Sequence, residues 1–192
     1  MEFSATPPGI RLHLMQERDL VAYKQLRDTM IAAHEDSFTS DAATERQRSA
    51  DSYRSRLGRA DDGGQAGASS PCLFTLCAWQ GPRLVGAVSC EGEARSKLRH
   101  TVHLIGMMVA DDCMGQGIGL ALLESTLRLL RADDELEQVL LTVTSSNTGA
   151  VRLYRRVGFE RYGQLPQALK CLDGRYLDKD LMRLNLRSSP RG

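Results

Sequence analysis

The sequence lacks the features that would place it in a membrane, an export pathway or a nucleic-acid complex. No apolar run reaches the about 18–20 residues that a membrane-spanning helix needs. Residues 1–9 have neither the basic start nor the apolar core of a signal peptide. The 25 Lys and Arg residues are offset by 24 Asp and Glu residues, and a net charge of +1 argues against a concentrated basic surface. We therefore expect a cytoplasmic protein that binds neither membranes nor nucleic acid.

The five cysteines lack the spacing of a metal site. There is no C-x-x-C pair and no nearby Cys/His quartet that could close around zinc, so we expect no metal. Buried or idle thiols in a reducing compartment are the simplest interpretation. Cys113 lies beside a glycine-rich turn, where a helix N-terminus can lower a thiol pKa. No histidine is close to it in sequence, so a nucleophilic role is the less favoured alternative.

What is present is the pattern of one globular domain, with 42% hydrophobic and 26% charged residues in a chain of 192. Apolar periodicity predicts the order β-α-α-β-β-β-α-β-α-β-β, hence a mixed, mostly antiparallel α/β sheet of six to seven strands with helices on both faces. The expected strands cover 10–15, 73–79, 84–91, 102–109, 138–144, 159–162 and 175–186; the expected helices cover 17–34, 41–59, 118–132 and 147–157. We expect a single domain over 1–192 with its core at about 10–186, and a Gly- and Ser-rich flexible loop at 60–70.

A glycine-spaced turn is the most informative segment. An apolar strand ends at Val109, the run Met114-Gly-Gln-Gly-Ile-Gly119 follows, and an apolar-periodic helix begins at Ile118. Such a turn directs main-chain N–H groups and the positive end of a helix dipole at one spot, which can bind phosphate. A purely structural turn is the alternative for this feature taken alone.

Two other phosphate-binding turns fit less well. A dinucleotide fingerprint needs G-x-G-x-x-G, but position 120 is Leu, and residues 142–144 after the next strand offer no acid for a ribose. This disfavours a nucleotide-binding oxidoreductase. A P-loop needs Gly-Lys-Ser/Thr, which is absent. A pyrophosphate turn for coenzyme A remains.

A second motif begins about thirty residues later, with the run Asn147-Thr-Gly-Ala-Val-Arg-Leu-Tyr-Arg-Arg-Val-Gly-Phe159. Together the two motifs resemble the GNAT superfamily of N-acetyltransferases, which carries Arg/Gln-x-x-Gly-x-Gly/Ala followed by N-x-x-A-x-x-L-Y-x-x-x-G-F. The order of elements matches from Ile10 to Leu186. One position departs, because Met114 stands where the family usually has Arg or Gln. That loss of a side-chain donor would weaken cofactor binding by about 1–3 kcal/mol, with Gln116 as partial compensation.

The resemblance implies a site for acetyl-coenzyme A. The strands ending at Val109 and Thr144 would part, and the pantetheine arm would bond the main chain of Met107 and Val109. The N–H of Met107 would also stabilise the oxyanion. Asn147 would bond the arm, in addition to capping its helix, and Tyr154 would protonate the departing thiolate. The pyrophosphate would lie on the main chain of Met114, Gly115, Gln116, Gly117, Ile118, Gly119 and Leu120.

The expected reaction is direct transfer of an acetyl group to a primary amine in a ternary complex. Many relatives carry a Glu six residues before the position of Val109; here it is His103, which by strand alternation would share a face with Ile105, Met107 and Val109. A neutral imidazole suits the role of base. His100, and then Glu91 and Glu93, are weaker candidates. A non-catalytic acyl-coenzyme-A-binding module is the alternative function.

The acceptor amine is not identified by the sequence. It would be shaped by the first two helices and the segments 92–99 and 163–173, and the acids of 34–38 could meet a cationic amine. A homodimer is possible, with the last strand as its edge.

Overall fold

The computed structural model describes residues 6–58 and 72–187 and contains one seven-stranded sheet of order β1-β2-β3-β4-β5-β7-β6. Its strands are β1 (Ile10–Leu14), β2 (Cys72–Gln80), β3 (Arg83–Gly92), β4 (Thr101–Val109), β5 (Gln138–Thr144), β6 (Glu160–Lys170) and β7 (Tyr176–Asn185). Its α-helices are α1 (Leu20–Ala33), α2 (Ala42–Gln47), α3 (Ile118–Arg131) and α4 (Thr148–Arg156). This is the element order that the sequence predicts, and the mixed α/β fold is confirmed.

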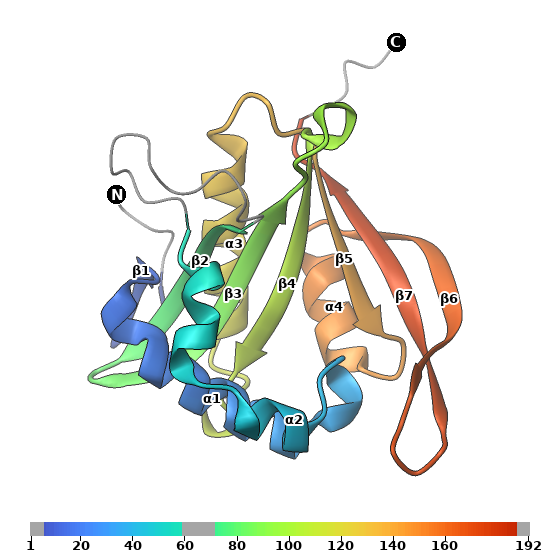
Figure 1. Cartoon of the computed structure of the whole chain (residues 1–192). Coiled ribbons are helices and arrows are strands. Elements are labelled where there is room, and N and C mark those ends of the chain that lie inside the picture. Colours follow the sequence, from blue (N-terminus) through green and yellow to red (C-terminus); the bar gives the residue numbers. More distant parts are fainter. Residues whose placement is uncertain (1–5, 59–71, 188–192) are drawn as a thin grey trace.

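Helices cover both faces of the sheet (Figure 1). α1 and α2 lie on one face, and α3 and α4 lie on the other. α3 begins at Ile118 and buries Leu122, Leu123 and Leu130 against the sheet, which follows from its apolar residues recurring every three or four positions. β2 and β3 form a hairpin around Gly81 and Pro82, with Gly81 in the left-handed region that glycine adopts freely.

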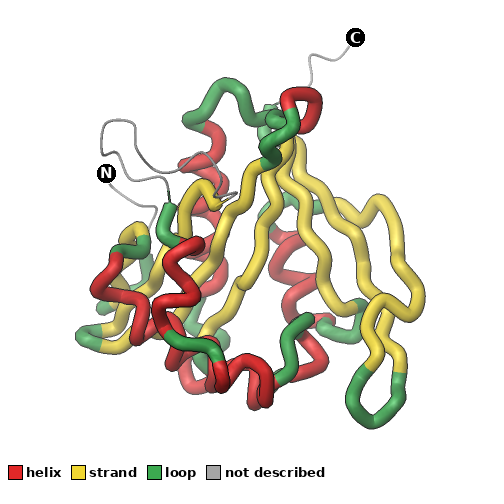
Figure 2. The backbone as a smooth tube through the Cα atoms, in the orientation of Figure 1, coloured by secondary structure: helices red, strands yellow, loops and turns green. Residues whose placement is uncertain are grey.

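β4 and β5 form the only parallel pair among the described strands, and they pair over a short stretch. The ladder runs from Thr101 to His103 on β4 and from Gln138 to Leu140 on β5, and it then stops. Figure 2 shows the two strands meeting at one end and diverging toward the other. The expected parting of this pair is therefore confirmed, and it leaves main-chain groups of both strands without a strand partner.

β4 also carries a bulge beside the parting. Ser89 pairs with Ile105 and Ala87 with Met108, so Gly106 and Met107 together oppose one residue of β3. Gly106 has a φ of +59°, a conformation that few other residues adopt. The expected strand alternation of His103 with Met107 and Val109 is wrong, because the extra residue reverses the alternation after Ile105. His103 instead shares its face with Ile105 and Met108.

Two other expectations need correction. The helix expected over 41–59 is divided into α2 and a 3-10 helix, η3 (Ala50–Arg56), because the backbone turns to an extended conformation at Arg48. The strand expected over 159–162 extends to Lys170 as β6, a mostly exposed edge strand whose pairing with β7 outweighs its weak apolar pattern.

The last strand is not an edge. β7 lies between β5 and β6, so the edges of the sheet are β1 and β6. The loop expected at 60–70 lies outside the described residues. Within the described ranges, no helix is both long and apolar enough to cross a membrane.

Candidate functional site

The glycine turn joins the end of β4 to the start of α3. A 3-10 turn, η5 (Asp111–Cys113), follows the strand, and then Gly115 and Gly117 take φ values of +75° and +82°. Gly119 is required for a different reason, because a Cβ there would lie 3.0 Å from Cδ2 of Leu153 on α4. The three glycines therefore set a turn that other side chains would strain or obstruct.

The free donors of this turn begin at Gly115. The N–H of Met114 already donates to the carbonyl of Asp111, so Met114 does not add a donor as the sequence suggested. Gly117 is the N-cap of α3 and provides no side-chain cap, so the N–H groups of the first helical turn lack an acceptor within the helix. Gln116 donates its side-chain amide to the carbonyl of Asp112 and braces the turn. The arrangement suits a diphosphate.

Two acids next to this turn are paired with side chains from other elements. His34, at the end of α1, lies 2.6 Å from Asp111, and the guanidinium of Arg83 forms a two-pronged pair with Asp112 at 2.6 and 2.9 Å. The hydrogen bond from Arg83 holds the pKa of Asp112 below its usual value. The pair of Arg83 with Asp112 reduces the repulsion that a phosphate would otherwise meet here.

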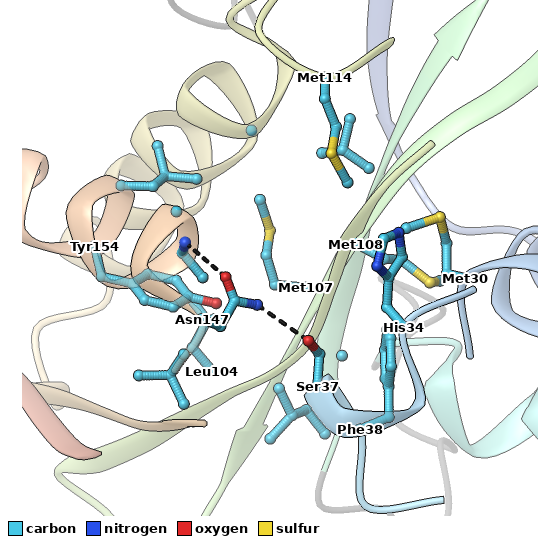
Figure 3. A pocket seen from close by; sticks show the side chains of 18 of the residues that line it. Met30, His34, Ser37, Phe38, Leu104, Met107, Met108, Met114, Asn147 and Tyr154 are labelled. Carbon is cyan, nitrogen blue, oxygen red and sulfur yellow. Dashed lines mark hydrogen bonds between the residues drawn. The ribbon is translucent and has the colours of Figure 1, made fainter. Parts of the chain in front are cut away.

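A cleft of about 1020 Å³ extends from the turn along the parted strands. Met107 and Val109 face the α3 side, since their side chains lie 3.4 and 3.7 Å from where a Cβ of Gly119 would be. Met108 points to the opposite side, toward Met30 of α1 (Figure 3). The N–H of Ala110 donates to Val85 on β3, so by strand alternation the N–H of Val109 points away from β3 and into the gap.

Asn147 and Tyr154 line this cleft from α4 (Figure 3). The side-chain oxygen of Asn147 accepts from the N–H of Ala150, which caps α4, and its amide nitrogen donates to the Ser37 hydroxyl at 3.2 Å. Tyr154 is buried and packs edge-on against Phe159. Burial raises the pKa of Tyr154, so its hydroxyl keeps its proton at neutral pH.

The candidate bases differ in their access to the cleft. Glu91 on β3 lines the cavity and receives a hydrogen bond of 2.7 Å from Arg56 of η3. His103 pairs with Glu91 across the two strands but is not among the lining residues, and its ring lies 3.5 Å from Glu93. His100 and Glu93 do not line the cavity either. Access therefore favours Glu91, which the sequence ranked below His103.

The sequence did not single out the polar wall on the α1 side. Arg27 lines the cavity, and its guanidinium donates to the buried Glu45 of α2, which also accepts from the Tyr53 hydroxyl. The sequence signal for this pair was one Arg and one Glu on two expected helices. Such residues are common on protein surfaces, so the pattern did not indicate a buried pair. Of the segments expected to shape the acceptor site, 92–99 and 163–173 contribute no lining residue, and Asp36 is engaged by Arg175.

Neither Cys113 nor Cys77 is an activated thiol. Burial raises the pKa of Cys113 and of Cys77, which disfavours the thiolate form that a nucleophile needs. No group of His, Cys, Asp and Glu side chains suited to a metal ion occurs among residues 6–58 and 72–187.

The chain is similar in sequence to a known protein family and to curated relatives. The model of the acetyltransferase (GNAT) family matches residues 27–159. An L-methionine sulfoximine/L-methionine sulfone acetyltransferase of Pseudomonas aeruginosa is 37% identical over 99 residues, which are 50% of this chain and 54% of that protein. A mycothiol acetyltransferase of Geodermatophilus obscurus is 40% identical over 96 residues, covering 48% of this chain and 30% of that protein. The chain thus aligns with about half or less of the length of these curated relatives.

The fold is shared with solved structures. A Salmonella typhimurium protein solved with its cofactor acetyl-CoA superposes with a TM-score of 0.75 at 19% identity, over 95% of this chain and 97% of that one. At this identity the similarity concerns the fold.

Proposed function

Because the chain belongs to the GNAT acetyltransferase family, we propose that it transfers an acetyl group from acetyl-coenzyme A to a primary amine. The observation that carries this proposal is the parting of β4 and β5 directly before a turn with unsatisfied main-chain donors. The diphosphate would lie on the N–H groups of 115–120, and the pantetheine arm would follow the gap past Met107 and Val109.

The proposed reaction is a direct attack within a ternary complex. The amine nitrogen forms a bond to the thioester carbonyl carbon, and the carbon–sulfur bond breaks. The N–H of Met107 would stabilise the negative charge that develops on the carbonyl oxygen. The Tyr154 hydroxyl would protonate the leaving thiolate, a role supported by its burial in the cleft wall and its raised pKa.

The amine must lose a proton before it attacks. An alkyl amine with a pKa of about 10.4 is neutral for only about one molecule in a thousand at pH 7. We assign the removal of this proton to Glu91, directly or through water, because Glu91 lines the cavity. His103 remains the alternative. Glu91→Gln should lower kcat/KM by about 100-fold or more while His103→Gln changes it little; the opposite pattern would return the role to His103.

Cofactor binding can be tested without knowing the acceptor. Acetyl-coenzyme A at 100 times its Kd should stabilise the fold by about 2.7 kcal/mol and raise the melting temperature by about 5–10 °C. NAD and ATP should raise the melting temperature far less, and equal shifts for all three compounds would refute acetyl-coenzyme A as the cofactor. An amine panel with thiol release as readout then tests transfer. Binding without turnover on any amine would favour the non-catalytic alternative.

Two further expectations belong to this proposal. We propose a cytoplasmic location, which the use of acetyl-coenzyme A supports and which cell fractionation would check. Association of two copies would use an edge strand, and β6 is favoured over β1 because it exposes two large apolar residues, Tyr162 and Leu165, where β1 exposes Leu14 alone. Light scattering of the wild type and of Tyr162→Lys would test it.

A further inference from the structure

The cleft has a charged wall on the α1 side that the proposed chemistry does not use. Arg27 is 8% exposed and lines the cavity. Its Nε donates to Glu45, which is 1% exposed and lies behind it. Tyr53 donates to the same carboxylate oxygen, so Glu45 anchors the guanidinium from a position that a ligand cannot reach.

The anchored Arg27 side chain borders the cavity and stays charged. Within the described part of the chain, the Nε of Arg27 donates to Glu45 and its guanidinium also lies against the Tyr53 hydroxyl, while the side chain as a whole lines the cavity. Burial opposes the charge, but the neighbouring Tyr23, Glu45 and Tyr53 outweigh burial and hold the pKa of Arg27 above its usual value. A charged, nearly buried guanidinium that lines a cavity is a binding group for a planar anion.

The guanidinium lies next to the expected reacting centre. A Cβ on Gly106 would be 3.8 Å from Nη1 of Arg27. Gly106 is the bulge residue directly before Met107, whose N–H would meet the acetyl carbonyl. Arg27 therefore lies beside the residue that precedes Met107, and an anion bound to Arg27 would lie close to the acetyl carbonyl that the amine attacks.

Other charges near this wall are already paired. Glu91 is bonded by Arg56, and Asp36 is engaged by Arg175. Arg48 packs over the Tyr53 ring at 5.2 Å but does not line the cavity. An anionic group on the acceptor would therefore meet the Arg27 guanidinium without meeting an unpaired carboxylate among the described lining residues.

We propose that the acceptor is an α-amino acid whose carboxylate binds Nη1 and Nη2 of Arg27. The inference rests on the proposed acetyl transfer and names its substrate class. In an α-amino acid the amine and the carboxylate share one carbon, so a carboxylate on Arg27 holds the amine beside the acetyl group. The substrate side chain would lie against the apolar residues Met30, Phe38 and Met108, which line the same part of the cavity (Figure 3).

Three compounds isolate the contribution of the carboxylate. L-Methionine, L-methioninamide and 3-(methylthio)propylamine share an amine and a side chain and differ in the group on the α-carbon. Rates are compared at equal concentrations of the neutral amine. The wild type should prefer L-methionine by at least about 100-fold in kcat/KM, as expected when a buried charged group is left unpaired. Similar values for all three would overturn the inference while leaving acetyl transfer in place.

Variants then assign the preference to Arg27. Arg27→Met alone would leave Glu45 buried without its cation, so the main variant is Arg27→Met with Glu45→Gln. Its kcat/KM for L-methionine should exceed that for 3-(methylthio)propylamine by less than about threefold, with the Kd for acetyl-coenzyme A little changed. Arg27→Lys keeps the charge and loses the two-pronged guanidinium, so its preference for L-methionine should lie between those of the wild type and the double variant. This variant tests the assignment if the double variant does not fold.

Lys179→Met is the matched control, because Lys179 of β7 is another cation that lines the cavity. The preference of Lys179→Met for L-methionine over its two analogues should equal that of the wild type. Loss of the preference in Lys179→Met, and not in the Arg27 variants, would overturn the assignment. Failure of every amine despite binding of acetyl-coenzyme A would refute acetyl transfer itself, and this inference with it.

Discussion

At the scale of single residues, Tyr154 illustrates how burial tunes a side chain for chemistry. Its ring is buried, no hydrogen bond of its hydroxyl is found among the described residues, and burial raises its pKa. A phenol in this state holds its proton and can donate it to a leaving thiolate.

Tyr154→Phe should therefore lower kcat by about 100-fold or more and change the Kd for acetyl-coenzyme A by less than about threefold. Thiol release and calorimetry measure the two quantities. Because the raised pKa keeps the proton on the hydroxyl, Tyr154 should not cause a fall in rate between pH 7 and pH 10. Tyr162→Phe, on the exposed face of β6, is the control; an unchanged rate in Tyr154→Phe would remove this residue from the mechanism.

Gly117 is a second residue whose conformation has a direct consequence. Its φ of +82° places it in the left-handed region, where an Ala costs about 1–2 kcal/mol. It is also the N-cap of α3, so relaxing that strain would move the donors of the turn.

Gly117→Ala should lower the free energy of unfolding and raise the Kd for acetyl-coenzyme A about tenfold. Gly81→Ala, at a φ of +56° in the β2–β3 hairpin, should lower stability comparably and leave the Kd unchanged. Equal Kd values in both variants would mean that the turn does not hold the cofactor. Denaturant titration and calorimetry make the comparison.

At the scale of elements, α1, α2 and η3 are joined by one buried polar cluster. Glu45 and Tyr53 are eight residues apart, which in a continuous helix would separate them by about 12 Å along the axis. The turn at Arg48 lets the Tyr53 hydroxyl reach Glu45. The sequence predicted one helix here because a capping Asp41 and many polar residues give no signal for that break.

The cluster predicts a specific loss of stability at high pH. Burial and the hydrogen bond to Glu45 raise the pKa of Tyr53 to about 12. Between about pH 10 and 12 the unfolded chain loses this proton and the folded chain keeps it, so the contribution of Tyr53 to stability is constant below pH 10 and falls above it. In Tyr53→Phe this fall should be shallower, and stability at pH 7 should be lower by about 1.5–3 kcal/mol. Denaturant titrations from pH 8 to 11 test both; an equally steep fall in Tyr53→Phe would refute the shift.

At the scale of the whole molecule, the site is a defect in an otherwise continuous sheet. The ladder between β4 and β5 stops after His103, while the ladder between β3 and β4 continues to Val109. The N–H of Val109 therefore faces the gap, and that of Ala110 is bonded to Val85.

Coenzyme A should change these two amides differently. A carbonyl of the pantetheine arm would accept from Val109, so its hydrogen exchange should slow by at least about tenfold at saturating coenzyme A. The exchange of Ala110 should stay slow with or without coenzyme A. Exchange measured by NMR resolves the two residues, and no change at Val109 would place the arm elsewhere.

The sequence by itself determined the elements that carry strong local patterns. The strand over 138–144, the start of α3 at Ile118 and the cap at Asn147 agree with the structure almost to the residue, because apolar period and turn glycines are local properties. Only the tertiary structure decided the length of β6, the bulge at Gly106 and the access of Glu91 to the cleft. The same holds for the packing of Arg27 on Glu45, since ion pairs and strand register depend on contacts between segments far apart in the chain.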